Sequence, residues 1–148
     1  MDVLFNIREA VPADAETLAE INREELGYHC DTEMISRRLE ELDKRREVVF
    51  TAEADGEVIG YIHVEEYKVL YCETMANYLG VAVSSRYRRM GAGTALIKAA
   101  EEWALSRGIT MMRLNSGSTR TGAHEFYRSM GYTDDKTQLH FLKKLKVQ

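Results

Sequence analysis

The residues best suited to chemistry lie where an apolar segment gives way to a helical one. Arg88 and Arg89 follow the apolar run Val81–Val83, and Gly91 and Gly93 come just before a helical pattern. The first N–H groups of a helix have no intrahelical partner, and the helix dipole favours an anion at that end. Glycine lets phosphate oxygens approach the backbone closely. The segment therefore predicts a pyrophosphate site, and a glycine-containing loop whose arginines only face water is the alternative.

Two common phosphate-binding motifs do not fit this segment. A P-loop needs the pattern GxxxxGK[ST], which the chain does not contain. A dinucleotide fingerprint needs a third glycine where this chain has Leu96, and an acidic residue about 20 positions further on. Thr110–Asn115 supplies no acidic residue there. The site is therefore not of the P-loop or dinucleotide-binding type.

The elements that would position this site follow from hydrophobic periodicity and turn signals. Gly27 is expected to end the first helix, Asp31 to cap the second, and Asp55-Gly56 to form a hairpin turn. We expect strands at Leu4–Arg8, Val48–Ala52, Val58–Val64, Tyr78–Val83, Thr110–Leu114 and Thr137–Val147. We expect helices at Ala13–Leu26, from Asp31 through Leu42, and at Gly91–Arg107 and Thr119–Met130. This order predicts an α+β layered domain, with antiparallel hairpins followed by a βαβ unit.

Length and charge exclude several classes of protein. A chain of 148 residues predicts one domain, residues 1–148. Its 20 Lys and Arg against 24 Asp and Glu give a net charge of −4, which argues against a dedicated nucleic-acid binder. No run approaches the roughly 18 apolar residues of a membrane span. Cys30 and Cys72 form no metal or redox spacing, so we expect buried or half-buried thiols and a cytoplasmic protein.

Two separate stretches share their pattern with one known family. Arg88–Gly93 reads RRMGAG and fits the pattern [RQ]-x-x-G-x-[GA]. Leu114–Gly117, and then Ala123–Tyr132 with its A-x-x-F-Y and terminal G-Y, are similar to the downstream segment of that family. With the connecting helix and strand in the right order, the whole chain resembles the GNAT superfamily of acyl-CoA-dependent N-acetyltransferases. The resemblance implies a mixed, mostly antiparallel twisted sheet of six to seven strands. Helices would cover both faces, and the central strands Tyr78–Val83 and Thr110–Leu114 would splay apart.

The resemblance also assigns cofactor-binding residues for acetyl-CoA. The pantetheine arm would lie between the splayed strands, paired with the backbone of Val81 and Val83, while Asn115 reaches the cofactor or an ordered water. Backbone amides from Arg89 to Thr94 would hold the pyrophosphate. The implied cofactor-binding set is Val81, Ala82, Val83, Arg88, Arg89, Met90, Gly91, Ala92, Gly93, Thr94, Asn115 and Tyr127.

Acyl transfer needs a neutral amine, a stabilised carbonyl oxygen and a proton for the leaving thiolate. The resemblance places Tyr127 near the thioester sulfur as the proton donor, although its helical spacing also fits core packing. Asn77 occupies the position where many relatives carry a glutamate that acts as the general base, and the side-chain amide of asparagine cannot accept the proton of the amine. We therefore expect Glu73 to act as the base, with His63, Glu65 and Glu66 as alternatives acting through water.

The amine acceptor is a small molecule or a peptide, and the resemblance does not identify it. Acidic residues in the two N-terminal helices and in Tyr67–Asn77 would suit a cationic amine. Arg128 replaces the second histidine of an HExxH pattern that begins at His124, so no metal site is expected. Dimers are frequent in the family, which makes a homodimer an expectation. A non-catalytic acyl-CoA-binding module of the same fold, and a nucleotide-binding αβ domain, are the competing interpretations.

Overall fold

The computed structural model describes residues 4–147, which fall into two compact units, Met1–Leu114 and Asn115–Gln148. The first unit contains the strands β1 (Asn6–Glu9), β2 (Glu47–Ala54), β3 (Glu57–Tyr67), β4 (Met75–Val83) and β5 (Met112–Arg113). Its helices are α1 (Ala15–Ile21), α2 (Thr32–Glu40) and α3 (Ala92–Ser106). It also contains the short helical turns η1 (Pro12–Asp14), η2 (Asn22–Leu26) and η3 (Ser85–Tyr87). The second unit contains α4 (Thr121–Ser129).

The sheet of the first unit has five strands in the order β1-β2-β3-β4-β5. Neighbouring strands from β1 to β4 are antiparallel, and β5 is parallel to β4. Asp55 and Gly56 form the predicted tight turn between β2 and β3, both with positive φ. The α+β class and the mostly antiparallel sheet are confirmed. The prediction of six to seven strands is wrong for the described residues, which form five.

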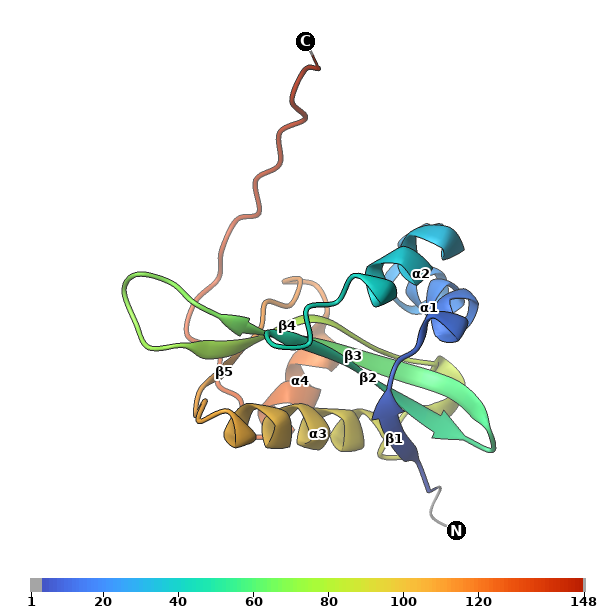
Figure 1. Ribbon diagram of the computed structural model, residues 1–148. Coiled ribbons are helices and arrows are strands. Elements are labelled where there is room, and N and C mark those ends of the chain that lie inside the picture. Colours follow the sequence, from blue (N-terminus) through green and yellow to red (C-terminus); the bar gives the residue numbers. More distant parts are fainter. Residues whose placement is uncertain (1–3, 148) are drawn as a thin grey trace. The chain divides into compact units, whose positions relative to one another are not determined.

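Helices cover both faces of this sheet within the first unit (Figure 1). Alternate residues of β3 point to opposite faces, and Ile62 and Val64 are fully buried on the face that α3 contacts. On the other face, α1 and α2 pack against Val49 and Ala82 in one apolar cluster. The face under α1 and α2 therefore presents Tyr61, His63 and Glu65, which alternate with the residues buried under α3.

The segment predicted as one helix, Ala13–Leu26, is broken into three parts. Pro12 begins the 3₁₀ turn η1, α1 follows, and η2 widens to π-helical bonding in which the Gly27 N–H reaches the carbonyl of Asn22. Gly27 ends the helix in the left-handed conformation (φ 75°), as predicted. Asp31 caps α2 by accepting a hydrogen bond from the Glu33 amide at 2.9 Å, also as predicted.

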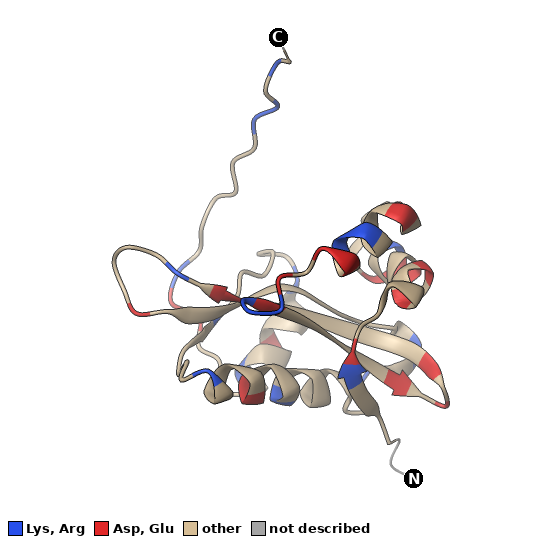
Figure 2. Ribbon diagram, in the orientation of Figure 1, with Lys and Arg blue, Asp and Glu red and all other residues tan. Residues whose placement is uncertain are grey.

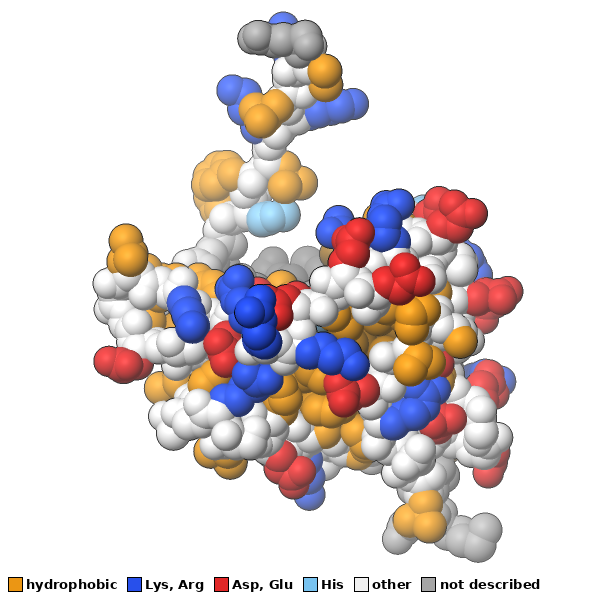
Figure 3. Space-filling view, in the orientation of Figure 1, with side chains coloured by type: hydrophobic (Ala, Val, Ile, Leu, Met, Phe, Trp, Pro, Cys, Tyr) orange, Lys and Arg blue, Asp and Glu red, His pale blue; other side chains and the backbone are white. Residues whose placement is uncertain are grey.

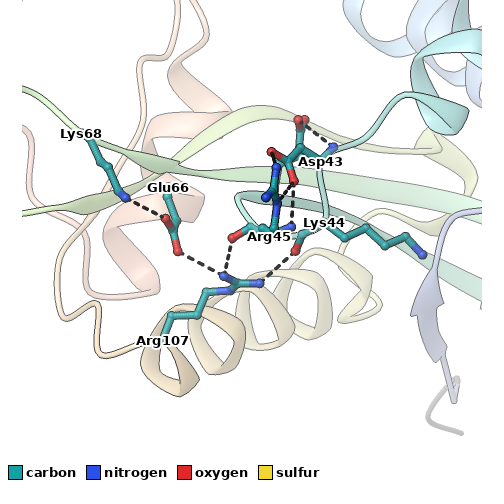
Figure 4. A network of polar contacts seen from close by, with 7 residues as sticks. Asp43, Lys44, Arg45, Glu66, Lys68 and Arg107 are labelled. Carbon is teal, nitrogen blue, oxygen red and sulfur yellow. Dashed lines mark hydrogen bonds and ion pairs between the residues drawn. The ribbon is translucent and has the colours of Figure 1, made fainter.

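A single arginine at the end of α3 fastens this helix to the sheet and to the segment before β2 (Figure 4). Arg107 donates to the carbonyls of Lys44 (3.0 Å) and Arg45 (2.7 Å) and to the Glu66 carboxylate (3.1 Å). Glu66 also pairs with Lys68 at 3.6 Å. These bonds fix the C-terminal end of α3, and with it the direction in which its N-terminus points.

The second unit consists of α4 and an extended tail. The predicted closing strand Thr137–Val147 is wrong: this segment forms no strand and its residues are exposed. Leu139, Phe141, Leu142, Leu145 and Val147 are each more than three-quarters exposed, and the apolar side chains of the tail appear in orange in Figure 3. Alternating residues indicate a strand only when another strand supplies hydrogen bonds, and no such pairing is formed by the described residues of this segment.

Two further expectations can be compared with residues 4–147. Within that range, no helix is both long and apolar enough to cross a bilayer. The two thiols are free, as expected, but only Cys30 is half-buried. Cys72 lies exposed in the connection between β3 and β4, so its predicted partial burial is wrong.

Candidate active site

The loop between β4 and α3 has a backbone shape suited to an anion. Arg89 has φ 63° and Gly91 has φ 95°, so two residues just before α3 are left-handed. Successive backbone N–H groups in such a conformation turn towards one point and form an anion-binding concavity. Gly91 is the N-cap of α3, and no side chain caps the helix there. The first amides of α3 are therefore left for an external acceptor.

Arg88 of this loop is already paired with Glu25, which the sequence indicated only as one of the acidic residues of the N-terminal helices. Glu25, in η2, accepts a hydrogen bond from the Ser85 amide at 2.9 Å and pairs with Arg88 at 3.1 Å. The Glu25 side chain is only 7% exposed, whereas that of Arg88 is 68% exposed. Nothing in the sequence distinguishes Glu25 from its neighbour Glu24, because only the fold brings η2 to the loop.

The strands β4 and β5 separate soon after they meet. Their parallel pairing joins Ala76 with Met112 and Asn77 with Arg113, and no β5 residue pairs with Leu79–Val83 in the described structure. Val81 and Val83 are half-buried in this part of β4, and Ala82 is buried. The splayed strands expected from the sequence are thus present, and β4 offers backbone groups on the side facing away from β3.

A bulge interrupts β4 within this stretch. His63 pairs with Gly80 and Val64 pairs with Tyr78, which leaves Leu79 as the extra residue, 51% exposed. A bulge turns one peptide out of the regular ladder, and bulges are common next to active sites. A Cβ atom at position 80 would lie 3.1 Å from the Tyr61 hydroxyl oxygen, so a larger residue here would require the Tyr61 side chain to shift.

Four polar residues form a row across the sheet on the face that carries α1 and α2; we call Glu47, Glu65, Asn77 and Arg113 the polar row. In register, Glu47 lies opposite Glu65, Glu65 opposite Asn77, and Asn77 beside Arg113. The Asn77 amide donates to Glu65 at 2.8 Å and accepts from Arg113 at 2.7 Å. His63, two residues from Glu65, contacts Glu47 at 2.8 Å.

A cavity of about 130 Å³ opens next to this row, between α1, α2 and the sheet. Its walls are mostly apolar, with Asn22, Arg38, Tyr61 and His63 as polar members. The Tyr61 hydroxyl donates to Asn22, and burial raises the pKa of Tyr61 to about 12. Tyr61 is therefore a neutral hydrogen-bonding group at physiological pH rather than a base.

The other predicted bases lie apart from Asn77 or are already paired. Glu73 is exposed in the connection between β3 and β4. Glu66 points to the opposite face of β3, where Arg107 and Lys68 bind it. Among the candidates His63, Glu65, Glu66 and Glu73, only Glu65 is hydrogen-bonded to Asn77 in the described structure.

The second unit holds two of the predicted site residues. Asn115 is exposed just after the first unit ends, and Tyr127 is half-buried on α4. Tyr127 packs against the rings of Phe126 and Tyr132, and burial raises the pKa of its hydroxyl. The nearby His124 bonds to the Gly117 carbonyl at 2.8 Å. Within the described residues, no group of three or more His, Cys, Asp or Glu side chains could hold a metal.

Charges on the N-terminal helices are mixed rather than uniformly acidic (Figure 2). Acidic residues occur on α1, η2 and α2, but α2 also carries Arg37 and Arg38. The acidic residues that the sequence analysis noted in these helices are thus accompanied by basic ones. The carboxylates on the sheet face lie in the polar row.

Comparison with known proteins identifies the class. The model of the acetyltransferase (GNAT) family matches residues 15–132. The N-alpha-acetyltransferase of Sulfurisphaera tokodaii is 26% identical, over 93% of this chain and 85% of its own length. An aminoglycoside N(6′)-acetyltransferase of Stenotrophomonas maltophilia is 27% identical, over 91% and 90% respectively. A solved aminoglycoside N-acetyltransferase in complex with CoA superposes with a TM-score of 0.82, covers 98% of each chain and is 18% identical.

The chain therefore belongs to the acetyltransferase (GNAT) family, because the family model covers well over half of it. It is an acyl-CoA-dependent acetyltransferase. The structural likeness, at 18% identity, extends the agreement to the fold over nearly the full length.

Proposed function

We propose that this enzyme transfers an acetyl group from acetyl-CoA to a primary amine of a small cationic acceptor. The amine attacks the thioester directly, without a covalent enzyme intermediate. The observation that carries the proposal is the uncapped N-terminus of α3, preceded by the left-handed residues Arg89 and Gly91. A helix end of this kind binds phosphate through backbone amides and the helix dipole.

The pyrophosphate of the donor is held by the loop and the first turn of α3. Backbone amides from Arg89 to Thr94 supply the hydrogen bonds, and the absent side chain at Gly91 leaves open space around its Cα atom. Arg89 is exposed and supplies positive charge. Arg88 adds charge at the edge of the loop while it remains tied to Glu25. The residues of this cradle are Arg88, Arg89, Met90, Gly91, Ala92, Gly93 and Thr94.

The pantetheine arm lies along β4 beyond the point where β5 separates. Its two amides pair with backbone groups of Val81 and Val83, on either side of the buried Ala82, as a further strand would. This mode of recognition depends on the backbone, so it needs no particular side chain. Asn115 contributes a polar side chain to the cofactor or to an ordered water.

Two groups act on the thioester itself. The peptide at the Leu79 bulge supplies a hydrogen-bond donor for the carbonyl oxygen, on which negative charge develops in the transition state. Tyr127 supplies the proton for the leaving sulfur, and the raised pKa of its hydroxyl keeps it protonated over a wide range of pH. Glu73, which the sequence analysis predicts as the base, is exposed and would act on the amine only through water.

The proposed acceptor is a polyamine-like or aminoglycoside-like small molecule. Two observations support this class: the relatives that include aminoglycoside acetyltransferases, and the cavity bordered by Tyr61 and His63 beside the carboxylates of the polar row. The alternative acceptor is a peptide α-amine, since another relative is an N-alpha-acetyltransferase. We place the enzyme in the cytoplasm as a single catalytic domain, in keeping with two unpaired thiols.

The test is a thiol-release assay with acetyl-CoA across a panel of amines. The panel contains sisomicin, spermidine and a peptide with a free α-amine. Release of CoA that depends on one of these amines, with acetylated amine seen by mass spectrometry, supports the proposal. CoA binding without turnover on any amine contradicts it and favours the acyl-CoA-binding module.

A further inference from the structure

We infer that Glu65 accepts the proton of the acceptor ammonium group, in place of the carboxylate that Asn77 does not provide. The inference rests on the proposed acetyl transfer to an amine. It assigns a residue to the one step for which the sequence pattern offers no match.

That step is needed because an ammonium nitrogen has no lone pair with which to attack the thioester. The family resemblance places the base at position 77, where this chain has asparagine. A carboxamide donates and accepts hydrogen bonds but does not take up a proton at neutral pH. Another group within reach of position 77 has to do so.

Glu65 lies directly opposite Asn77 in the antiparallel pairing of β3 with β4. Its Oε2 atom accepts a hydrogen bond from the Asn77 side-chain nitrogen at 2.8 Å. Adjacent strands are about 4.8 Å apart, so the carboxylate is displaced by one strand from the position that the family pattern predicts. It stays on the same face of the sheet as His63, which lies two residues before it on β3 and lines the cavity.

Asn77 and Arg113 are positioning residues for this carboxylate. Asn77 is only 8% exposed, and its oxygen accepts a hydrogen bond from Arg113 at 2.7 Å. The Arg113 guanidinium in turn stacks over the Tyr67 ring, 4.3 Å from its centre. Because the amide is bound at both ends, its NH₂ group is turned towards Glu65. Among the described residues, the second oxygen of Glu65, Oε1, has no hydrogen-bond donor and can accept a proton.

The charged and titratable groups around Glu65 come from each neighbouring element. Glu47 on β2 lies opposite Glu65, and its carboxylate is held by His63. Arg113 on β5 supplies positive charge through Asn77, and Arg38 of α2 lines the adjoining cavity. His63 already directs Nε2 at Glu47, which leaves Glu65 as the carboxylate bound to Asn77 with an open oxygen.

Two protons leave the ammonium nitrogen during the reaction. A proton moves from the ammonium nitrogen to a Glu65 oxygen, directly or through one water, and leaves a lone pair on nitrogen. That pair forms the N–C bond to the acetyl carbon, and the C–S bond breaks with its electrons on sulfur. Tyr127 gives its proton to the thiolate and is reprotonated by the second proton that nitrogen loses as the amide forms, while Glu65 returns its proton to solvent.

The experiment compares Glu65→Gln with the double variant Glu65→Gln/Asn77→Glu, which restores a carboxylate at the position expected from the family. Glu40→Gln is the matched control, because Glu40 is an exposed carboxylate at the end of α2. Turnover with acetyl-CoA and sisomicin or spermidine is followed from about pH 6 to about pH 9, since loss of a base changes the pH profile. CoA affinity is measured by calorimetry.

Loss of a general base lowers kcat/KM by about 100-fold or more at neutral pH. We expect this for Glu65→Gln, with unchanged CoA affinity and a rate that keeps rising with pH because solvent must deprotonate the amine. The kcat/KM of the double variant should be at least about tenfold higher than that of Glu65→Gln, and Glu40→Gln should match the wild type. If the wild type is active and Glu65→Gln is equally active, the inference about Glu65 is wrong while the proposed function stands. The same holds if Glu65→Gln loses activity with an unchanged pH profile and the double variant does not regain it. A wild type that turns over none of the panel amines overturns the proposed function, and the assignment of Glu65 with it.

Discussion

Glu25 and Arg88 are 63 residues apart in the chain, yet their side chains form an ion pair of 3.1 Å between η2 and the cofactor loop. The same carboxylate accepts the Ser85 amide, so it binds both ends of the η3 turn. The predicted phosphate-binding arginine is therefore held by an internal anion. This contact links η2, whose Asn22 lines the cavity beside the sheet, to the loop that we propose binds the donor.

Glu25→Ala should weaken CoA binding about fivefold, which is about 1 kcal/mol. The loop loses the acceptor that fixes Ser85 and Arg88, and must be ordered by CoA itself. Glu24→Ala is the control, since Glu24 is an exposed neighbour in the same turn. Calorimetric titration of both variants decides the matter. Tighter binding by Glu25→Ala would mean that the carboxylate competes with the pyrophosphate for Arg88.

Gly91→Ala should weaken CoA binding by at least about tenfold. A side chain at φ 95° is strained by about 1–2 kcal/mol, and relief of that strain would rotate the amides that bind phosphate. Gly108, just beyond the other end of α3, also has a positive φ (76°) and open space around it. Gly108→Ala should therefore lower the melting temperature to a similar degree while CoA affinity stays the same. Equal CoA affinity of the two variants would remove Gly91 from the site.

Tyr127→Phe should lower kcat about 100-fold, as expected for loss of a general acid, and leave CoA affinity intact. The ring and its contacts with Phe126 and Tyr132 remain. Because burial raises the pKa of the hydroxyl, its protonated form persists to a higher pH than that of an exposed tyrosine. The wild-type rate should fall only as the pH passes this raised pKa, and this alkaline fall should be absent from Tyr127→Phe. Identical profiles would show that Tyr127 only packs α4.

Asp14→Asn should destabilise the fold at neutral pH by about 2 kcal/mol, because it removes one partner of a partly buried ion pair. Asp14 binds Arg8 through two hydrogen bonds of 2.8 Å, and Arg8 also binds Glu53. Arg8 and the Val11 amide lower the pKa of Asp14 in the folded state. The stabilisation is thus complete above the unfolded pKa, and it is lost as the pH falls through the folded pKa.

Urea unfolding at neutral pH and near pH 3 tests this dependence on Asp14. The difference between wild type and Asp14→Asn should shrink at the lower pH. Asp134→Asn is the control, because the Arg128–Asp134 pair is largely exposed and such pairs contribute little. A constant difference between wild type and Asp14→Asn at both pH values would contradict the assignment.

The sequence predicted the parts of the fold that depend on local signals. Gly27, Asp31 and the Asp55-Gly56 turn behave as their residue types predict, because each acts within a few residues of its own backbone. The tail strand was wrong because strand formation needs a distant partner that alternation cannot specify. The hydrophobic periodicity also does not change at the positions where the first helix breaks into η1, α1 and η2.

The candidate site likewise contains some residues that local sequence signals predict and others that only the fold brings together. The glycine-arginine loop was recognisable because its chemistry is carried by consecutive residues. The sequence placed Glu65 only among several alternative bases and did not indicate Arg113; strand register brings both to Asn77, from positions 12 and 36 residues away in the chain. Glu25 reaches Ser85 only through packing of η2 on the loop. No spacing rule on one sequence connects these positions.

The separation of β4 from β5 has a consequence for how the protein behaves in concentrated solution. The pairing of β4 with β5 ends at Asn77 and Arg113, and no β5 residue pairs with Leu79–Val83, so this part of an interior strand resembles an edge strand on that side. Such edges promote pairing between molecules and aggregation. If acetyl-CoA binds along β4 as proposed, it would cover this edge as well as donate the acetyl group, and light scattering should record more self-association of the protein without the cofactor than with it.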